Sequence, residues 1–138
     1  MRRVLFVLLF AACGTSTDVE SQLTITQGLY GQLTQACTGE GCVGAPRTGT
    51  PLGWFETNPF ARDGGVAPMP VMKTQSKANG FYEFDLASGA RGYLAVGKPD
   101  TQAGTVWFSA TSVSVPLGLG RVDWKATAGA EGQWTDVR

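Results

Sequence analysis

Glycine and proline interrupt this chain so often that few segments are long enough to form a helix. The 138 residues include 19 glycines and seven prolines. After residue 12, only residues 15–27 and 105–115 run for more than ten positions without either type. The first stretch is rich in serine and threonine, and the second (TVWFSATSVSV) is dominated by β-branched and hydroxyl-bearing residues, which favour strands. Because stable helices avoid both breakers over about 8 to 20 residues, we predict an all-β protein.

Seven segments show the alternation or the β-branched composition of strands, at the regular spacing typical of a sandwich or barrel. In one of them, Tyr82, Phe84 and Leu86 alternate with Glu83 and Asp85, which places the first three on the core face. Residues 58–70 contain three prolines and a Gly-Gly pair, and we predict a long loop there. The expected strands are residues 29–35, 52–57, 70–75, 81–86, 93–96, 105–110 and 119–126.

The Asn79-Gly80 pair separates the third and fourth expected strands. Asn-Gly is typical of type I′ hairpin turns, because both central residues of such a turn need a positive φ. We therefore predict a hairpin that pairs residues 70–75 with residues 81–86, and a second reversal of the chain at residues 88–92.

The N-terminus has the organisation of a secretory signal peptide. Arg2 and Arg3 precede an unbroken apolar run, residues 4–12 (VLFVLLFAA). A helix that crosses a bilayer needs about twenty apolar residues, so this run is too short for a permanent span. A short positive region before such a run is instead typical of a signal peptide, which we assign to residues 1–12.

The end of this run resembles the lipobox of bacterial lipoproteins. In Leu9-Phe10-Ala11-Ala12-Cys13, small residues precede a cysteine, which the resemblance marks as the lipidated N-terminus. The resemblance implies two or three acyl chains, and more than one chain anchors a protein stably. We then expect a polar tether over residues 13–21, a folded domain over residues 22–138 and a place in the bacterial outer membrane. Cleavage without lipidation is the alternative, and it would leave Cys13 as a free thiol.

Charge and histidine content exclude several classes of function. The chain has 11 basic and 11 acidic residues and no histidine. Removal of the signal peptide removes two arginines, so the remaining chain carries 9 − 11 = −2. A nucleic-acid partner would require a clearly basic surface, and we expect no such partner. Without histidine, neither a Ser-His-Asp triad nor an imidazole metal site can form.

Two further cysteines lie in one glycine-rich loop. Cys37 and Cys42 enclose Thr38-Gly39-Glu40-Gly41. Because the cell envelope is oxidising, we expect these two cysteines to form a disulfide, which stabilises the fold by about 2 kcal/mol in the loop-entropy model. The alternatives are weaker, because a structural zinc site needs four ligands and a redox site typically has C-x-x-C spacing.

The middle of the chain resembles a known family of β-sandwich domains. Residues 74–86 (TQSKANGFYEFDL) and 89–96 (GARGYLAV) resemble the carboxypeptidase regulatory-like domain, akin to the transthyretin-like and Cna-B-type sandwiches. Residues 28–35 (GLYGQLTQ) and 120–124 (GRVDW) resemble the opening and closing strands of that family. The resemblance implies a seven-stranded antiparallel prealbumin-like sandwich, found as a structural, spacer or adhesion module and seldom as a catalyst.

Few residues have the spacing of a catalytic or metal site, so we expect neither an enzyme nor a cofactor. Glu83 and Asp85 fall on one face of a strand, but their alternation with aromatic residues favours a solvated surface. Asp63 is followed by Gly64-Gly65 and lacks the further acidic ligands of a calcium loop.

The four tryptophans are the remaining candidates for a functional role. In a small sandwich, we expect Trp54, Trp107 and Trp124 to lie in the core. Trp134, near the C-terminus, is the candidate for partner binding, because we expect it either to be exposed or to cap an edge strand.

These observations predict a non-catalytic, lipid-anchored protein of the cell envelope that acts as a structural or a protein- or glycan-binding module. Its expected partners are the membrane, through the anchor, and an envelope protein or glycan. The alternative is a small closed β-barrel that carries an apolar ligand or inhibits a cell-wall-degrading enzyme.

Overall fold

The computed structural model describes residues 19–37, 39–40, 44–61, 63–126 and 133–137. These residues form β-strands and short 3₁₀ helices, which confirms the all-β prediction, but with nine strands rather than seven. No helix in the described ranges is long and apolar enough to cross a membrane. The strands are β1 (Gly28–Gln35), β2 (Pro51–Phe55), β3 (Met72–Gln75), β4 (Phe81–Phe84), β5 (Arg91–Asp100), β6 (Gly104–Ser114), β7 (Leu119–Arg121), β8 (Asp123–Ala126) and β9 (Trp134–Val137), and the 3₁₀ helices are Val19–Gln22, Asp63–Gly65 and Ala78–Gly80.

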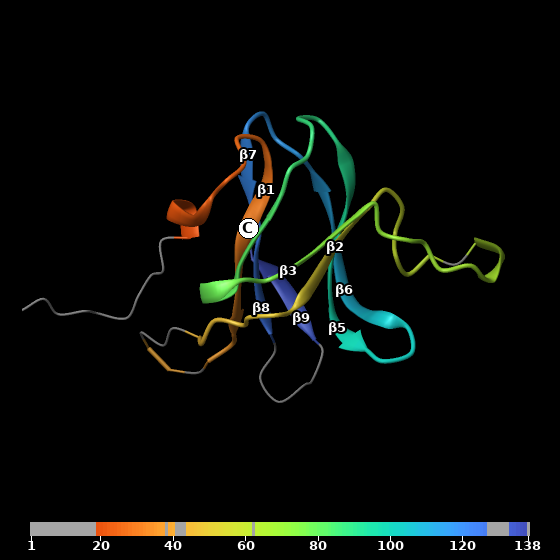
Figure 1. Ribbon diagram of the computed structural model, residues 1–138, viewed down its shortest axis with the longest axis horizontal. Helices are drawn as coiled ribbons and strands as arrows, with labels where there is room; N and C mark the ends of the chain where they lie inside the picture. The colour runs from red at the N-terminus through yellow and green to blue at the C-terminus, as the bar shows by residue number, and fades with distance from the viewer. Residues whose placement is uncertain (1–18, 38, 41–43, 62, 127–132, 138) are drawn as a thin grey trace, which may run out of the picture.

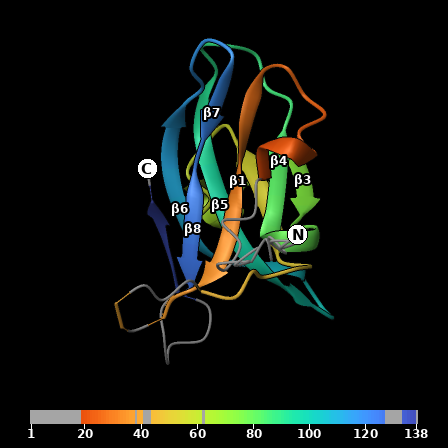
Figure 2. The same cartoon turned by 90° about the vertical axis from the view of Figure 1, so that its left-hand side faces the viewer.

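The strands are arranged in two sheets (Figure 1). The first has the order β4-β1-β8-β9, with β7 also paired to β1, and the second has the order β3-β2-β5-β6. Most pairs are antiparallel, but β1 runs parallel to both β7 and β8, so the prediction of a wholly antiparallel sandwich is wrong at this position. Figure 2 shows β3 and β4 together at one edge of the molecule and β6 and β9 together at the other.

One hydrophobic core lies between the two sheets. Tyr82, Phe84 and Leu86 all belong to it, which confirms the face predicted from their alternation. Trp54 and Trp124 are also buried there, with only 3% and 1% of their surface exposed. Because both sheets supply side chains to the same core, the fold is sandwich-like and is not a single closed barrel. The other core members include Leu29 and Leu33 from the first sheet, and Leu52, Leu94, Val96 and Val113 from the second.

The strand expected over residues 119–126 divides into β7 and β8 at Val122. The Val122 N–H donates to the Tyr30 carbonyl at 2.9 Å, while the Val122 carbonyl accepts a hydrogen bond from the buried Tyr82 hydroxyl. On the next residue, the Asp123 carboxylate accepts the Gln32 N–H at 2.9 Å. At this point the Tyr82 hydroxyl and the Asp123 carboxylate therefore take the places of two backbone partners, and the regular hydrogen-bond pattern is interrupted as at a β-bulge.

The Asn79-Gly80 turn has the expected backbone but joins strands of different sheets. Asn79 and Gly80 have φ angles of 62° and 72°, as a type I′ turn requires. However, β3 pairs with β2 and β4 pairs with β1, so the predicted hairpin between β3 and β4 is wrong. A Cβ on Gly80 would lie 2.2 Å from the Leu33 carbonyl oxygen. The turn therefore packs directly on β1, and this contact carries the chain from one sheet to the other.

The residues before β1 pack on the outer face of the first sheet. Val19 is fully buried in a small cluster with Tyr30 and Phe81, and Leu23 packs against it. The Tyr30 hydroxyl donates to the Glu20 carboxylate at 3.0 Å. Packed structure therefore begins by Val19, earlier than the domain boundary expected at residue 22.

Candidate binding groove

Long polar side chains form a row on the outer face of the second sheet, along β3. Lys73 lies opposite Gly53 in the β2–β3 ladder, and the next residue of β2, Trp54, points into the core. Lys73 therefore points outward, as does Gln75 two residues later. Lys77 follows in an extended conformation and continues the row. β3 is the last strand of its sheet among the described residues, so this row borders a sheet edge.

Trp107 lies on the same outer face, and its expected place in the core is wrong. The β5–β6 register shifts after Val96: Ser109 pairs with Val96, but Trp107 pairs with Gly97, so Phe108 is an extra residue on β6. Residues on the two sides of such a bulge differ in the face they occupy. Because Val96 points into the core, Gly97 and its partner Trp107 point outward.

Two glycines make room for the Trp107 indole. A Cβ on Gly53 would lie 2.7 Å from Cη2 of the indole, and a Cβ on Gly97 would lie 3.1 Å from its Cε3. The Phe55 ring meets the indole edge-on, with ring centroids 5.2 Å apart and an interplanar angle of 90°. The ring is therefore held closely against β2 and β5, in an arrangement that aromatic pairs favour.

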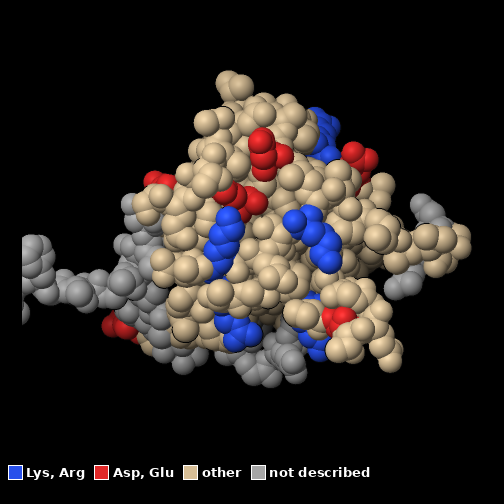
Figure 3. All heavy atoms as spheres, viewed as in Figure 1, with Lys and Arg blue, Asp and Glu red and all other residues tan. Residues whose placement is uncertain are grey.

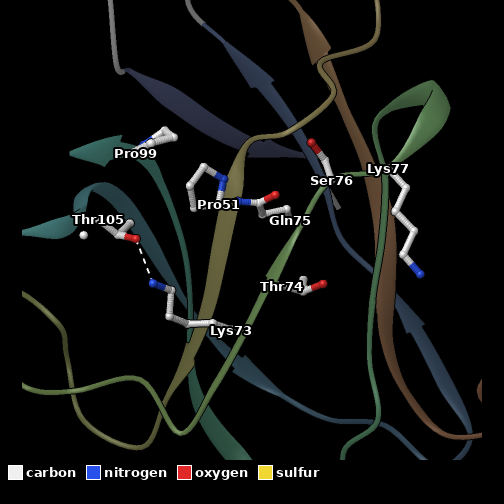
Figure 4. A pocket seen from close by; sticks show the side chains of 9 residues that line it. Pro51, Lys73, Thr74, Gln75, Ser76, Lys77, Pro99 and Thr105 are labelled. Atoms are coloured by element: carbon white, nitrogen blue, oxygen red, sulfur yellow. Dashed lines mark hydrogen bonds between the residues drawn. The ribbon is translucent and has the colours of Figure 1, made fainter. Parts of the chain in front are cut away.

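Lys73 bridges from β3 to this aromatic pair. Its Nζ donates to Thr105 Oγ1 at 2.8 Å (Figure 4) and lies 5.9 Å from the centroid of the Trp107 ring. The second distance is within the range of a cation–π contact. A hydroxyl and a ring, both on β6, therefore fix the position of this ammonium group.

Three adjoining hollows make up what we call the β3 groove. The largest, about 550 Å³, is lined by residues 73–77 and by Pro51, Pro99, Gly104 and Thr105. A second hollow of about 240 Å³ shares Lys73 and Thr105 with the first and lies between Trp107 and residues 67–70 of the long loop. The Lys73–Thr105 hydrogen bond marks the boundary between these two (Figure 4).

Trp134 lines the third hollow, which has a volume of about 150 Å³ and shares Pro51 and Pro99 with the largest one. The Trp134 side chain is half-buried and packs against the core, and its backbone N–H donates to Ser109 Oγ at 3.2 Å. Trp134 thus lies on edge strand β9, where that strand contacts β6 of the other sheet. Its predicted role in partner binding remains a prediction.

The turn between β5 and β6 forms one wall of the groove and is held by Asp100. The Asp100 carboxylate accepts the N–H groups of Gln102 and Ala103 at 2.8 and 2.7 Å. These two backbone hydrogen bonds, opposed slightly by desolvation and assisted by Lys98, lower the pKa of the Asp100 carboxyl. The carboxylate therefore stays ionised into the acid range and keeps the turn in this shape.

Four cations line the β3 groove: Arg47, Lys73, Lys77 and Lys98. Within the described ranges, both ion pairs that form are made by Arg121 on the first sheet. Figure 3 shows Lys and Arg side chains around a hollow in the middle and lower part of this face. The groove is therefore locally basic, although the whole chain has no net charge.

The cysteine sites and the signal peptide are only partly within the described residues. Residues 1–12, Cys13 and Cys42 lie outside them. Cys37 follows β1, and the Gln35 N–H donates to the Ala45 carbonyl at 2.8 Å, which brings together the two ends of the segment that contains Cys37 and Cys42. The disulfide between them remains a prediction.

The acidic residues singled out in the sequence are not among the described residues that line the groove. Glu83 accepts a hydrogen bond from the Thr24 N–H at 2.9 Å, and Asp85 is exposed after the end of β4. Asp63 begins a 3₁₀ helix in the long loop. No group of three or more His, Cys, Asp or Glu side chains in the described part of the chain is arranged to hold a metal ion.

Sequence reasoning missed Trp107 and Lys73 as candidate binding residues. The available signal was Gly53 inside an expected strand, because a glycine in a strand often marks a close approach by another group; Gly97 lies just beyond the strand expected over residues 93–96. Comparisons with protein-family models, curated proteins and solved structures found no match for this chain. Its function is therefore inferred from the geometry of the β3 groove.

Proposed function

We propose that this protein is a non-catalytic, lipid-anchored binding module of the bacterial cell envelope, and that it binds a glycan in the β3 groove. The observation that carries the binding role is the position of Trp107. Its ring lies outside the core, beside the Lys73 ammonium group and a hollow of about 240 Å³. An aromatic ring next to hydrogen-bonding side chains is suited to the apolar face and the hydroxyl groups of a sugar.

The polar groups of the groove favour binding over catalysis. Lys73, Thr74, Gln75 and Lys77 line the largest hollow together with Thr105. These side chains donate and accept hydrogen bonds, whereas general acid–base catalysis commonly uses carboxylates or histidine near neutral pKa. The carrier-barrel alternative has less support, because the strands form two sheets and side chains fill the space between them.

The proposal includes a prealbumin-like variant of the sandwich, with a divided seventh strand and an added last strand. Support comes from the strand orders of the two sheets. It also comes from the central position of β1, which has β4 on one side and both β7 and β8 on the other. The proposal also includes the disulfide between Cys37 and Cys42. The Gln35–Ala45 hydrogen bond supports it, because that bond already brings the flanking segments together.

The anchor is proposed at Cys13, on the strength of its lipobox-like sequence. We expect the full chain, expressed in bacteria with an alkyne fatty acid, to be labelled and to fractionate with membranes. Cys13→Ser should abolish both properties, whereas the matched variant Cys37→Ser should keep the label. Undiminished labelling of Cys13→Ser would refute the anchor.

The binding role is tested separately, with the full chain in nonionic detergent and purified envelope polysaccharide. We expect co-sedimentation that Trp107→Ala reduces about tenfold or more, because the substitution removes the stacking surface. Leu117→Ala is the control, since Leu117 is 94% exposed and lies outside the groove. Equal co-sedimentation of the wild type and Trp107→Ala would remove the β3 groove from the proposal.

A further inference from the structure

The charge of the β3 groove differs from that of the rest of the chain. Of the nine basic residues that follow the signal peptide, four line the groove, while the chain after residue 12 has a net charge of −2. Neither of the described ion pairs involves any of the four. Of the four, Lys98 has the Asp100 carboxylate nearby. Cations gathered around one hollow raise the local concentration of anions.

Lys73 is held in a position to bind such an anion. A lysine ammonium group has three donors, and the Thr105 hydroxyl accepts one of them. The contact with the Trp107 ring further limits the movement of the side chain. Less conformational entropy is therefore lost when an anion binds than for a freely rotating surface lysine.

Lys77 marks a second anion position further along the groove. It lies four residues after Lys73 on extended backbone, which places the two Cα atoms about 13 Å apart at the rise of a β-strand. In Figure 4 the two side chains point in different directions, with Lys73 toward Thr105 and Lys77, just after the end of β3, away from it. One sugar ring is too short to contact both, so the groove suits an extended ligand with repeated negative charges.

The hollow beside Trp107 has a different character. Pro68, Met69 and Pro70 form its wall opposite the indole. A ligand that fits both regions therefore needs apolar ring faces as well as anionic groups. A saccharide chain that carries carboxylates has both, together with hydroxyl groups for Thr74 and Gln75.

We propose that the β3 groove binds an acidic saccharide chain, whose carboxylates pair with Lys73 and Lys77 while one sugar ring lies against Trp107. This proposal rests on the proposed glycan-binding function and specifies its ligand class. The groove exchanges ion pairs and hydrogen bonds with such a chain, and no covalent bond forms or breaks.

The test uses the full chain in nonionic detergent and a uronic-acid oligosaccharide of about six residues. Its methyl ester serves as the uncharged probe, and an oligoglutamate as the acidic peptide probe. We expect calorimetry to show an affinity for the acid at least about tenfold higher than that for the ester. The affinity for the acid should weaken as salt is added. Lys73→Gln and Lys77→Gln should each lower affinity for the acid about tenfold. Lys125→Gln, on the exposed side of β8, should leave it unchanged.

The outcomes separate this inference from the broader function. Equal binding of acid and ester, with loss in Trp107→Ala, would overturn the acidic preference and leave the glycan-binding function standing. Stronger lysine-dependent binding of the oligoglutamate than of the saccharide would overturn the saccharide. Failure of all three probes to bind would overturn both proposals. Thermal unfolding of each variant, expected within a few degrees of wild type, shows that the loss is local.

Discussion

At the scale of single residues, Tyr82 is the most consequential buried polar group. Its ring lies in the core with no exposed surface, and its hydroxyl donates to the Val122 carbonyl. Gly31 makes this approach possible, because a Cβ there would lie 1.9 Å from the Val122 carbonyl oxygen. Desolvation, reinforced by the charge of Asp123, raises the pKa of Tyr82 well above its ordinary value.

Tyr82→Phe should lower the free energy of unfolding by about 1 to 3 kcal/mol, because it leaves the buried Val122 carbonyl without its donor. Urea denaturation at neutral pH measures the effect. Tyr93→Phe is the matched control: Tyr93 is half-buried on β5, and its substitution should change stability by less than about 0.5 kcal/mol. A loss as large as that of Tyr82→Phe would show that the hydroxyl–carbonyl bond is not the cause.

The stability of Tyr82→Phe and that of the wild type should also change differently at alkaline pH. Because the folded pKa of Tyr82 lies above the ordinary value of 10.0, its contribution to stability is complete below that pH. The contribution falls as the pH rises further, since the unfolded state loses the tyrosine proton first. Denaturation between pH 9 and about 11 should therefore show a shallower decline in Tyr82→Phe than in wild type, and parallel declines would contradict the shift. Tyr30, whose pKa is also raised by burial and by Glu20, contributes to the decline in both proteins.

At the scale of elements, the break between β7 and β8 shows how a side chain can replace a backbone hydrogen bond between neighbouring strands. Asp123 accepts the Gln32 N–H at 2.9 Å and also contacts Arg121 Nε at 3.1 Å. The carboxylate therefore holds β1 and β8 together where no backbone carbonyl is in place.

Asp123→Ala should lower stability by about 1 kcal/mol, because the Gln32 N–H loses its acceptor in a partly exposed position. Asp123→Asn retains a side-chain oxygen and should lose less. Thermal unfolding compares the two, and hydrogen exchange at the Gln32 amide should accelerate in Asp123→Ala alone. Similar exchange rates in both variants would mean that the amide has another acceptor.

The elements also show what could be predicted from the sequence. Alternation in residues 81–86 gave the correct core face, and Asn79-Gly80 gave the correct turn backbone, because both depend on local geometry. Which strand pairs with β3 or β4 depends on distant packing against β1. The face of Trp107 depends on one extra residue at Phe108, and alternation within residues 105–110 carries no sign of it. β9 has only four residues and pairs with β8, so its pattern alone was too short to recognise.

At the scale of the whole molecule, the residues before β1 are part of the folded domain. Val19 is fully buried against the first sheet. The Thr24 N–H donates to Glu83 at 2.9 Å, and the Thr24 hydroxyl donates to the same carboxylate. This segment therefore covers the outer face of β1 and β4.

A chain that begins at Ile25 should be less stable than one that begins at Cys13 by about 3 kcal/mol. The loss combines the burial of Val19 and part of Leu23 with three hydrogen bonds, two from Thr24 to Glu83 and one from Tyr30 to Glu20. A chain that begins at Asp18 is the control and should match the longer one. Chemical denaturation compares the three, and equal stability of the Ile25 chain would show that the packing of this segment contributes little.

With the proposed anchor at Cys13, the docked N-terminal segment would also determine which way the molecule faces. Six peptide steps separate Cys13 from Val19, a reach of at most about 22 Å. With acyl chains on Cys13, the lipid surface would lie within that distance of the outer face of β1 and β4. The Lys73 and Trp107 side chains of the β3 groove point outward from the second sheet, on the opposite face of the molecule, so the proposed anchor would leave them facing away from the bilayer.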